Sequence, residues 1–95
     1  MARPTKLTDD QVQSELKRVE GWTVNAGKLH RSFKFADFIA AWGFMSRVAL
    51  IAQSMDHHPE WSNVYDTVSV DLSTHDAGGI TKLDFELARK INSNA

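Results

Sequence analysis

The stretch WSNVYDTVSVDLST, residues 61–74, alternates apolar and polar side chains over its second half. Val68, Val70 and Leu72 would face one side of a strand, and the other side would carry Thr67, Ser69, Asp71 and Ser73. This period of two predicts a β-strand over residues 67–74 with one buried face. Residues 61–65 predict a partner strand, with Asp66 near the turn, so the segment is expected to form an antiparallel hairpin.

A second hairpin is expected at WTVNAGKLHRSFKF, residues 22–35. Residues 22–24 form its first strand, and residues 25–27, Asn-Ala-Gly, tolerate the positive φ of a tight turn. Residues 28–35 then alternate, although Arg31 interrupts the apolar face. His30 falls on the polar face, where a solvated histidine is a better interpretation than a functional one.

Two helices carry capping boxes, in which a hydroxyl and a side chain three residues later satisfy the first backbone N–H groups. Thr8 and Gln11 start the first helix, which is expected to end at or before Gly21. Thr81 and Asp84 start the last helix, and capping is a sufficient explanation for Asp84 on its own.

The middle helix is expected from an Asp37 cap to about Ser54. One apolar stripe repeats at helical spacing along it, and further apolar residues lie off that stripe. A helix that is apolar on more than one side is either the central core helix or part of a subunit interface, and the sequence favours neither. The stripe consists of Phe38, Trp42, Met45, Ala49 and Ala52.

The order of elements is therefore αββαββα, within a single domain over residues 1–95. Two hairpins and three helices predict the α+β class, with a four-stranded antiparallel sheet and the helices packed on one face.

Charge and composition exclude several classes of function. The chain carries 11 basic and 12 acidic residues, which gives no strong attraction for nucleic acids or anionic membranes. It has no cysteine, so disulfides and cysteine-ligated metals are excluded. No apolar run approaches the roughly 20 residues of a membrane span, and no secretory signal is evident, so a cytoplasmic protein is expected.

The residues that could perform chemistry form two clusters at the ends of elements. An antiparallel hairpin places the start of its first strand beside the end of its second strand. The two clusters should therefore converge at one edge of the sheet. The first cluster is Asp56, His57, His58, Glu60 and Trp61, and the second is Ser73, Thr74, His75 and Asp76.

Three converging imidazoles suit proton transfer in both directions, because imidazole changes charge near neutral pH. Pro59 favours an extended backbone at His58, so His57 and His58 should point to opposite sides and have different roles, unless the local turn bends both into one pocket. Asp56 could fix a histidine tautomer, and Trp61 offers a flat surface for a planar ring. Two alternatives remain open from residue types alone, which are a Zn²⁺ site and a polar loop without function. The adjacent histidines and the lack of HExxH disfavour zinc.

The segment MDHHPEWSNVYDTVSVDLSTHDAGGIT, residues 55–81, closely resembles the signature of the pterin-4a-carbinolamine dehydratase family. The resemblance continues through LTDDQVQSEL, GWTV, LHRSFKFADFIAAWGFMSRVALIAQ and the last helix. It implies the αββαββα fold and the dehydration of 4a-hydroxytetrahydropterin to quinonoid dihydropterin, which recycles tetrahydrobiopterin. It also implies that no metal or organic cofactor is required.

The resemblance also assigns roles to residues. The family's catalytic histidines map by motif onto His57, His58 and His75, and its substrate pocket onto Asp56, Trp61, Ser73, Thr74 and Asp84. We expect His57 and His75 to transfer protons and His58 mainly to orient the substrate. The chain departs from animal members at Gln53, where they carry a glutamate, and at Leu83, which replaces a basic residue.

Partners follow from the same resemblance. A small pterin substrate and a homodimer or homotetramer are expected, without direct binding of nucleic acid or membrane. One alternative function is a protein-binding module, because animal members are also dimerisation cofactors of a homeodomain transcription factor. Another is a pterin-binding protein of a different pathway.

Overall fold

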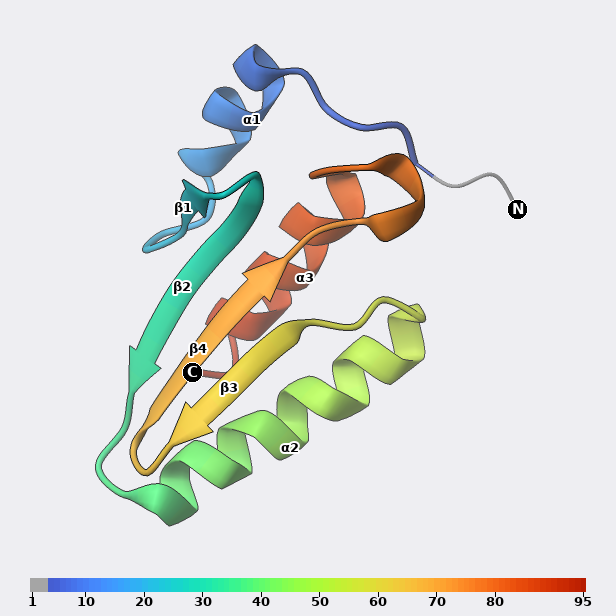
Figure 1. Cartoon of the computed structure of the whole chain (residues 1–95). Coiled ribbons are helices and arrows are strands. Elements are labelled where there is room, and N and C mark those ends of the chain that lie inside the picture. Colours follow the sequence, from blue (N-terminus) through green and yellow to red (C-terminus); the bar gives the residue numbers. More distant parts are fainter. Residues whose placement is uncertain (1–3) are drawn as a thin grey trace.

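A computed structural model describes residues 4–95 and shows an α+β domain (Figure 1). The order αββαββα is confirmed, with one short 3-10 turn, η1, added before the last helix. The elements are α1 (Asp9–Leu16), β1 (Thr23–Asn25), β2 (Lys28–Lys34), α2 (Phe38–Met55), β3 (Glu60–Val64), β4 (Thr67–Leu72), η1 (His75–Ala77) and α3 (Lys82–Asn92).

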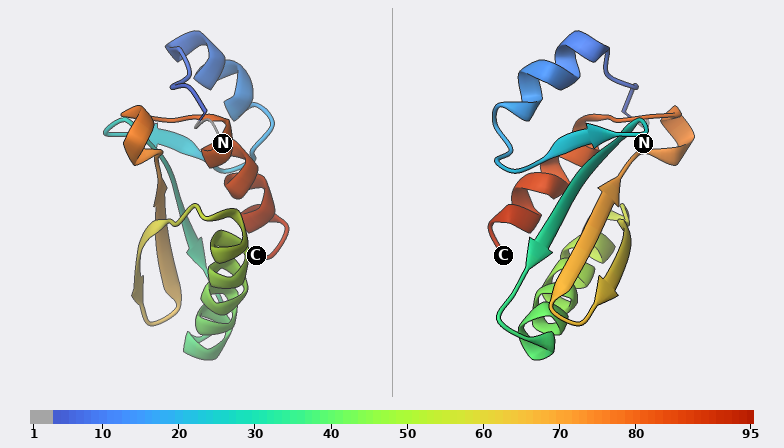
Figure 2. Two further views of the ribbon diagram at one scale, coloured as in Figure 1. Left: turned by 90° about the vertical axis from the view of Figure 1, so that its right-hand side faces the viewer. Right: turned by 60° about the vertical axis from the view of Figure 1, so that its left-hand side comes forward.

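The sheet has the strand order β1-β2-β4-β3, and every neighbouring pair is antiparallel. The two predicted hairpins therefore join through their second strands, with Leu29 opposite Leu72 at one end of the shared ladder. Helices α2 and α3 cover one face of the sheet, and α1 lies beyond the end where β2 begins (Figures 1 and 2). No helix within residues 4–95 covers the opposite face of the sheet, which is open (Figure 2).

The core forms between the sheet and the two covering helices. Strand β4 contributes Val68, Val70 and Leu72, all fully buried, as its alternation predicted. The Phe44 ring of α2 lies 4.9 Å from the Phe33 ring, between centroids. Aromatic pairs at such separations add to the free energy gained by burial. Further core residues are Val19, Trp22, Leu29, Ala41, Val48, Ile80, Phe85, Leu87, Ala88 and Ile91.

The buried face of α2 differs from the predicted stripe. Ala41, Phe44, Val48 and Ala52 face the core, and of these only Ala52 belonged to the stripe. Apolar residues surround most of this helix, so helical periodicity cannot choose the buried side. The exposed side of α2 carries Phe38 at 47%, Ile39 at 81%, Trp42 at 57% and Leu50 at 75% of full exposure.

By length and composition, α2 is the one helix among residues 4–95 that could cross a membrane. Four of its residues lie in the domain core, and Arg47 near its middle donates a hydrogen bond of 2.8 Å to the carbonyl of Asn94. Burying apolar residues against a sheet is how a core helix of an α+β domain packs.

Arg31 keeps its place on the covered face of the sheet because its charge is satisfied there. Its guanidinium lies 4.4 Å from the centre of the Phe33 ring. It also donates to the carbonyl of Glu20 at 2.7 Å and to Oδ1 of Asn92 at 2.8 Å. The interruption of the apolar pattern is therefore a contact between β2 and the end of α3.

Helix α1 ends at Leu16, before the Gly21 boundary expected from the sequence. The chain continues in turns, and Gly21 adopts a φ of 85°. A Cβ atom at this position would lie 2.6 Å from the Arg31 guanidinium. Glycine is thus required both for the positive φ and for the close approach of Arg31.

Candidate active site

A cavity of about 250 Å³ lies where the β3–β4 hairpin meets the end of α2. The register of the hairpin explains which residues meet there. Glu60 pairs with Asp71 at the end of the β3–β4 ladder. Continuing that register sets His58 opposite Ser73 and His57 opposite Thr74, so the two predicted clusters converge as expected. The cavity is lined by Asp56, His57, His58, Ser73, Thr74, His75 and Asp76.

The end of α2 orients the two adjacent histidines. Asp56 caps the helix in the left-handed region, with a φ of 51°. The N–H of His57 still donates to the carbonyl of Ala52 at 3.1 Å. The chain therefore turns sharply after the helix, and Pro59 follows with an extended segment. As a result, His57 is buried and His58 is exposed.

His57 is held from behind by a buried carboxylate. Its Nε2 lies 2.6 Å from Oδ1 of Asp84, which is fully buried. The other oxygen of Asp84, Oδ2, accepts from the hydroxyl of Thr74 at 2.9 Å and from the N–H of Thr81 at 2.8 Å. Because a carboxylate only accepts, His57 donates its Nε2 proton to Asp84, and Nδ1 is the nitrogen left to exchange a proton.

The hydroxyls behind His57 form an ordered chain. Thr74 uses its single proton on Asp84, so the 2.7 Å contact between Thr74 and Thr81 must use the proton of Thr81. Thr81 and Asp84 also form the capping box of α3 predicted from the sequence. Capping the helix and orienting His57 are thus two tasks of the same carboxylate.

His58 has a different environment from His57, as predicted. Its Nε2 lies 2.9 Å from Oε1 of Gln53, one turn earlier in α2. A neutral amide, and not a carboxylate, therefore contacts His58. The amide oxygen can fix the orientation of this ring without adding charge to the cavity.

His75 approaches the cavity from the other cluster. Strand β4 ends at Leu72, two residues earlier than predicted, and the N–H of Thr74 donates to the carbonyl of Gly79 at 2.8 Å. This bridge closes the η1 turn, which begins at His75 and ends at Gly78 with a φ of 75°. The turn leaves the His75 side chain exposed beside the cavity.

Two predicted pocket residues do not line the cavity. Asp84 lies behind His57, where it contacts the histidine and not the cavity. Trp61 pairs with Val70 on the covered face of the sheet and packs partly buried against the core. The other six predicted site residues all line the cavity.

Three further residues have a place in or beside the site. Asp76, which the sequence analysis grouped with the second cluster without assigning it a role, lines the cavity. Gln53, noted there as a departure from animal members, contacts His58, and Thr81 completes the buried hydroxyl chain. Thr81 was recognised only as a helix cap, because sequence spacing does not reveal a contact with Thr74 across the η1 turn.

Between residues 4 and 95, no three histidine or acidic side chains are grouped to hold a metal ion. Their orientations explain this, since His57 faces Asp84 and His58 faces Gln53.

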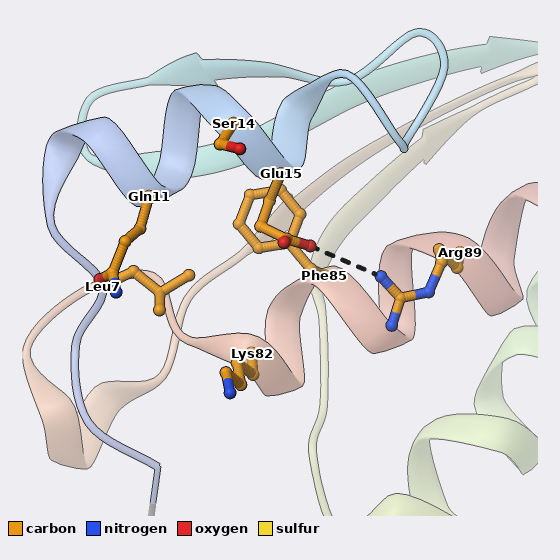
Figure 3. Close-up of a pocket in the computed structure, with 7 residues that line it drawn as sticks. All are labelled: Leu7, Gln11, Ser14, Glu15, Lys82, Phe85 and Arg89. Atoms are coloured by element: carbon orange, nitrogen blue, oxygen red, sulfur yellow. Dashed lines mark ion pairs between the residues drawn. The ribbon is translucent and has the colours of Figure 1, made fainter.

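A separate cavity of about 240 Å³ lies between α1 and α3 and contains no histidine (Figure 3). Figure 3 shows Glu15 and Arg89 facing each other across it, with their charged atoms 4.0 Å apart. An exposed pair at this distance contributes little free energy. This cavity therefore differs from the one at the end of the β3–β4 hairpin, which three histidines line.

The structure is thus a small α+β domain of αββαββα order, in which three histidines line one cavity and a buried carboxylate lies behind one of them. Residues 5–94 match the family model described as pterin 4 alpha carbinolamine dehydratase. The chain belongs to this family.

The relatives extend over nearly the whole chain. A protein of Solibacter usitatus, named "Putative pterin-4-alpha-carbinolamine dehydratase", is 57% identical over 91 residues, covering 96% of each chain. A protein of the same name from Prochlorococcus marinus strain MIT 9303 is 49% identical over 93% of this chain and 92% of its own length. The crystal structure of a transcriptional coactivator/pterin dehydratase from Brucella melitensis superposes with a TM-score of 0.93 at 45% identity, covering 96% of this chain and 99% of that one.

Proposed function

We propose that this protein dehydrates 4a-hydroxytetrahydropterin to quinonoid dihydropterin and water, and so recycles tetrahydrobiopterin. The observation that carries the proposal is the 2.6 Å contact between His57 and the buried Asp84 at the edge of a cavity that two further histidines line. A histidine held by a carboxylate through one nitrogen presents the other nitrogen as a defined proton acceptor or donor.

The reaction breaks the bond between C4a and its hydroxyl oxygen and removes the proton on N5. Hydroxide is a poor leaving group, so an imidazolium protonates the oxygen as the bond breaks. The N5 proton passes to a neutral imidazole or to water, and the N5 electron pair forms the new C4a=N5 bond. One histidine donates a proton and the other accepts one, so the total charge of the two histidines does not change. A proton that then passes between them restores the starting protonation state of each.

We assign the proton transfers to His57 and His75 and the orientation of substrate to His58. His57 and His75 come from opposite sides of the hairpin end, so they can serve two different atoms of one bound ring. His58 is held by Gln53, which suits a positioning role. The hydroxyl and backbone groups of Ser73 and the carboxylate of Asp56 would hydrogen-bond the amide-like edge of the pterin, while Thr74 would support the pocket through its hydrogen bond to Asp84. Trp61 would support the histidine cavity from the covered side of the sheet.

Stopped-flow measurement of 4a-hydroxytetrahydropterin dehydration tests the proposal. Pure protein should accelerate the reaction, and His57→Ala or His75→Ala should each reduce the rate by about 10²–10⁴-fold, the usual contribution of general acid–base catalysis. Failure of the wild-type protein to accelerate dehydration would refute the function. Unchanged rates in both variants would refute the division of roles.

We further propose a homodimer or homotetramer in the cytoplasm. The support is the exposed apolar side of α2, since exposed apolar patches commonly mark protein interfaces. Sedimentation at micromolar concentration should show an oligomer, and a purely monomeric species would contradict this expectation.

A second candidate function is that of a dimerisation cofactor for a transcription regulator. The same exposed face of α2, with Ile39, Trp42 and Leu50, favours a helical protein partner, and the Brucella melitensis neighbour is described as a transcriptional coactivator. A pull-down from native lysate with wild-type protein and with Trp42→Ser tests this candidate. This candidate is supported if the wild-type protein captures a transcription regulator and the Trp42→Ser variant does not. It loses its support if the wild-type protein captures no regulator that the variant fails to capture.

A further inference from the structure

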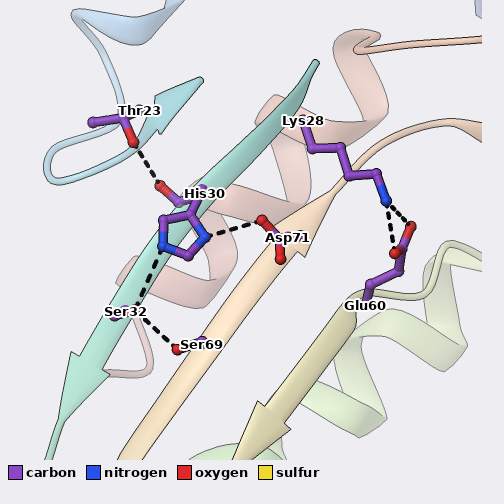
Figure 4. Close-up of polar contacts among 7 residues, drawn as sticks. All are labelled: Thr23, Lys28, His30, Ser32, Glu60, Ser69 and Asp71. Carbon is purple, nitrogen blue, oxygen red and sulfur yellow. Dashed lines mark hydrogen bonds and ion pairs between the residues drawn. The ribbon is translucent and has the colours of Figure 1, made fainter. Parts of the chain in front are cut away.

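The open face of the sheet carries an ion pair beside the candidate active site. The ammonium of Lys28 on β2 reaches across β4 to the carboxylate of Glu60 at the start of β3 (Figure 4). Its Nζ lies 2.9 Å from one oxygen of Glu60 and 2.8 Å from the other. The pair therefore forms a bridge over β4 with donors and acceptors facing solvent.

This pair lies directly beside the site cavity. Glu60 follows His58 by two residues and pairs with Asp71 in the ladder. Leu29 pairs with Leu72, so continuing that register sets Lys28 opposite Ser73, which lines the cavity. Ser73 shares the open face with Asp71 because side chains two residues apart in a strand point to the same side. Ser73 therefore belongs both to the lining of the cavity and to the open face that carries the ion pair.

A second polar pair extends this surface. Nδ1 of His30 lies 2.9 Å from Oδ1 of Asp71 (Figure 4). The row across the three strands is His30, Asp71 and Glu60, with Lys28 next to it. Two carboxylates, an ammonium and an imidazole therefore stand together beside the cavity, with a formal charge of −1 when the imidazole is neutral.

This set of groups suits a neutral, hydroxylated ligand part. Carboxylates accept hydrogen bonds from vicinal hydroxyls, as acidic residues do from the ribose of dinucleotides. An ammonium donates to the hydroxyl oxygens. A strongly anionic ligand part would instead meet Glu60 and Asp71, and an apolar one would gain nothing from charged neighbours.

We propose that Lys28 and Glu60 form a specificity subsite for a hydroxylated side chain on C6 of the pterin, a vicinal diol, that projects from the histidine cavity onto the open face of the sheet. This inference rests on the proposed function, since it supposes that the ring lies among His57, His58 and His75. In it, Glu60 accepts from a side-chain hydroxyl and Lys28 donates to its neighbour.

The fold does not depend on this pair, which makes the subsite testable. Exposed ion pairs contribute little to stability. The hydrogen bond that Lys28 donates to Glu60 raises the pKa of Lys28, so its ammonium remains a donor throughout the neutral range. Replacing either residue should therefore alter recognition and leave the protein folded.

The experiment compares two substrates in three variants. The substrates are 4a-hydroxytetrahydropterins with a dihydroxypropyl group or a methyl group on C6, and the variants are Lys28→Met, Glu60→Gln and Lys34→Met. Lys34 is a matched control, because it lies at the far end of β2, opposite Thr67. Lys28→Met and Glu60→Gln should each lower kcat/KM for the dihydroxypropyl substrate by about two- to tenfold, the value of one lost hydrogen bond. The methyl substrate and the Lys34→Met variant should show no change.

A binding arm separates failure of the subsite from failure of the proposed function. The dissociation constants of the corresponding stable dihydropterins are measured by calorimetry with the same variants. Equal losses for both side chains, or no loss for either, would overturn the subsite. If the wild-type protein catalyses no dehydration, the proposed function fails, and the ratio of the two dissociation constants in the variants then decides the subsite alone.

Discussion

Replacing Asp84 by asparagine changes the proton arrangement of His57 without changing the shape of the side chain. In the wild-type protein, Asp84 accepts from the Nε2 proton of His57 through one oxygen. Its other oxygen accepts from Thr74 and from the N–H of Thr81. Asparagine has one oxygen and one NH₂ group, so it can serve only one of these two sides as an acceptor.

The backbone decides which way the asparagine faces. The N–H of Thr81 is buried and cannot turn away, and the amide must therefore direct its oxygen toward Thr81 and Thr74. Its NH₂ group then points at Nε2 of His57 and forces that nitrogen to accept. The proton of the neutral imidazole moves to Nδ1, so the nitrogen available for the reaction becomes a donor in place of an acceptor.

The expected loss in kcat for Asp84→Asn is about 10²–10⁴-fold, because the variant removes the proton acceptor while the ring stays in place. The stability cost is smaller, about 1.5–3 kcal/mol, since hydrogen bonds to a charged group become neutral ones. Stopped-flow dehydration measures the rate, urea unfolding measures the stability, and ¹⁵N spectra of the histidine ring report its tautomer. A folded variant with wild-type kcat, or with the proton of His57 still on Nε2, would refute the reasoning.

Three further variants test other parts of the structure. Phe44→Ala removes a fully buried ring from the core and should lower the free energy of unfolding, measured in urea, by about 3–5 kcal/mol. A loss below about 1 kcal/mol would show that neighbouring core side chains fill the space left by the ring. Gly21→Ala places a Cβ at positive φ against Arg31 and should cost about 1–2 kcal/mol in the same assay, and a neutral result would contradict the described turn. Gln53→Ala frees His58 and should raise KM with little change in kcat, while a fall in kcat equal to that of His57→Ala would assign His58 a proton-transfer role.

The strands were predictable because side-chain alternation is local. Val68, Val70 and Leu72 are buried as their spacing requires, and the hairpin that contains them brings the two histidine clusters together. Likewise, the capping boxes at Thr8 and Thr81 mark true helix starts, since they depend only on residues three apart.

The buried side of α2 was not predictable, because its choice depends on the sheet it meets. Phe44 and Trp42 are both large and apolar, yet Phe44 packs against Phe33 while Trp42 faces solvent. The placement of Asp84 behind His57 was hidden for a related reason. Nothing in the spacing of 27 residues between them indicates a contact.

The separation of His57 from His58 follows from the backbone of one residue. Asp56 adopts a φ of 51°, a region that asparagine and aspartate tolerate better than most residues. If α2 continued one more turn, both imidazoles would lie on a helix, about 100° apart, and neither would meet Asp84 and Gln53 as they do. The left-handed turn at Asp56 directs His57 inward to a carboxylate, and the extended segment before Pro59 leaves His58 outside beside an amide. Two chemically identical neighbours thus acquire different partners, which is the physical basis for assigning proton transfer to one and orientation to the other.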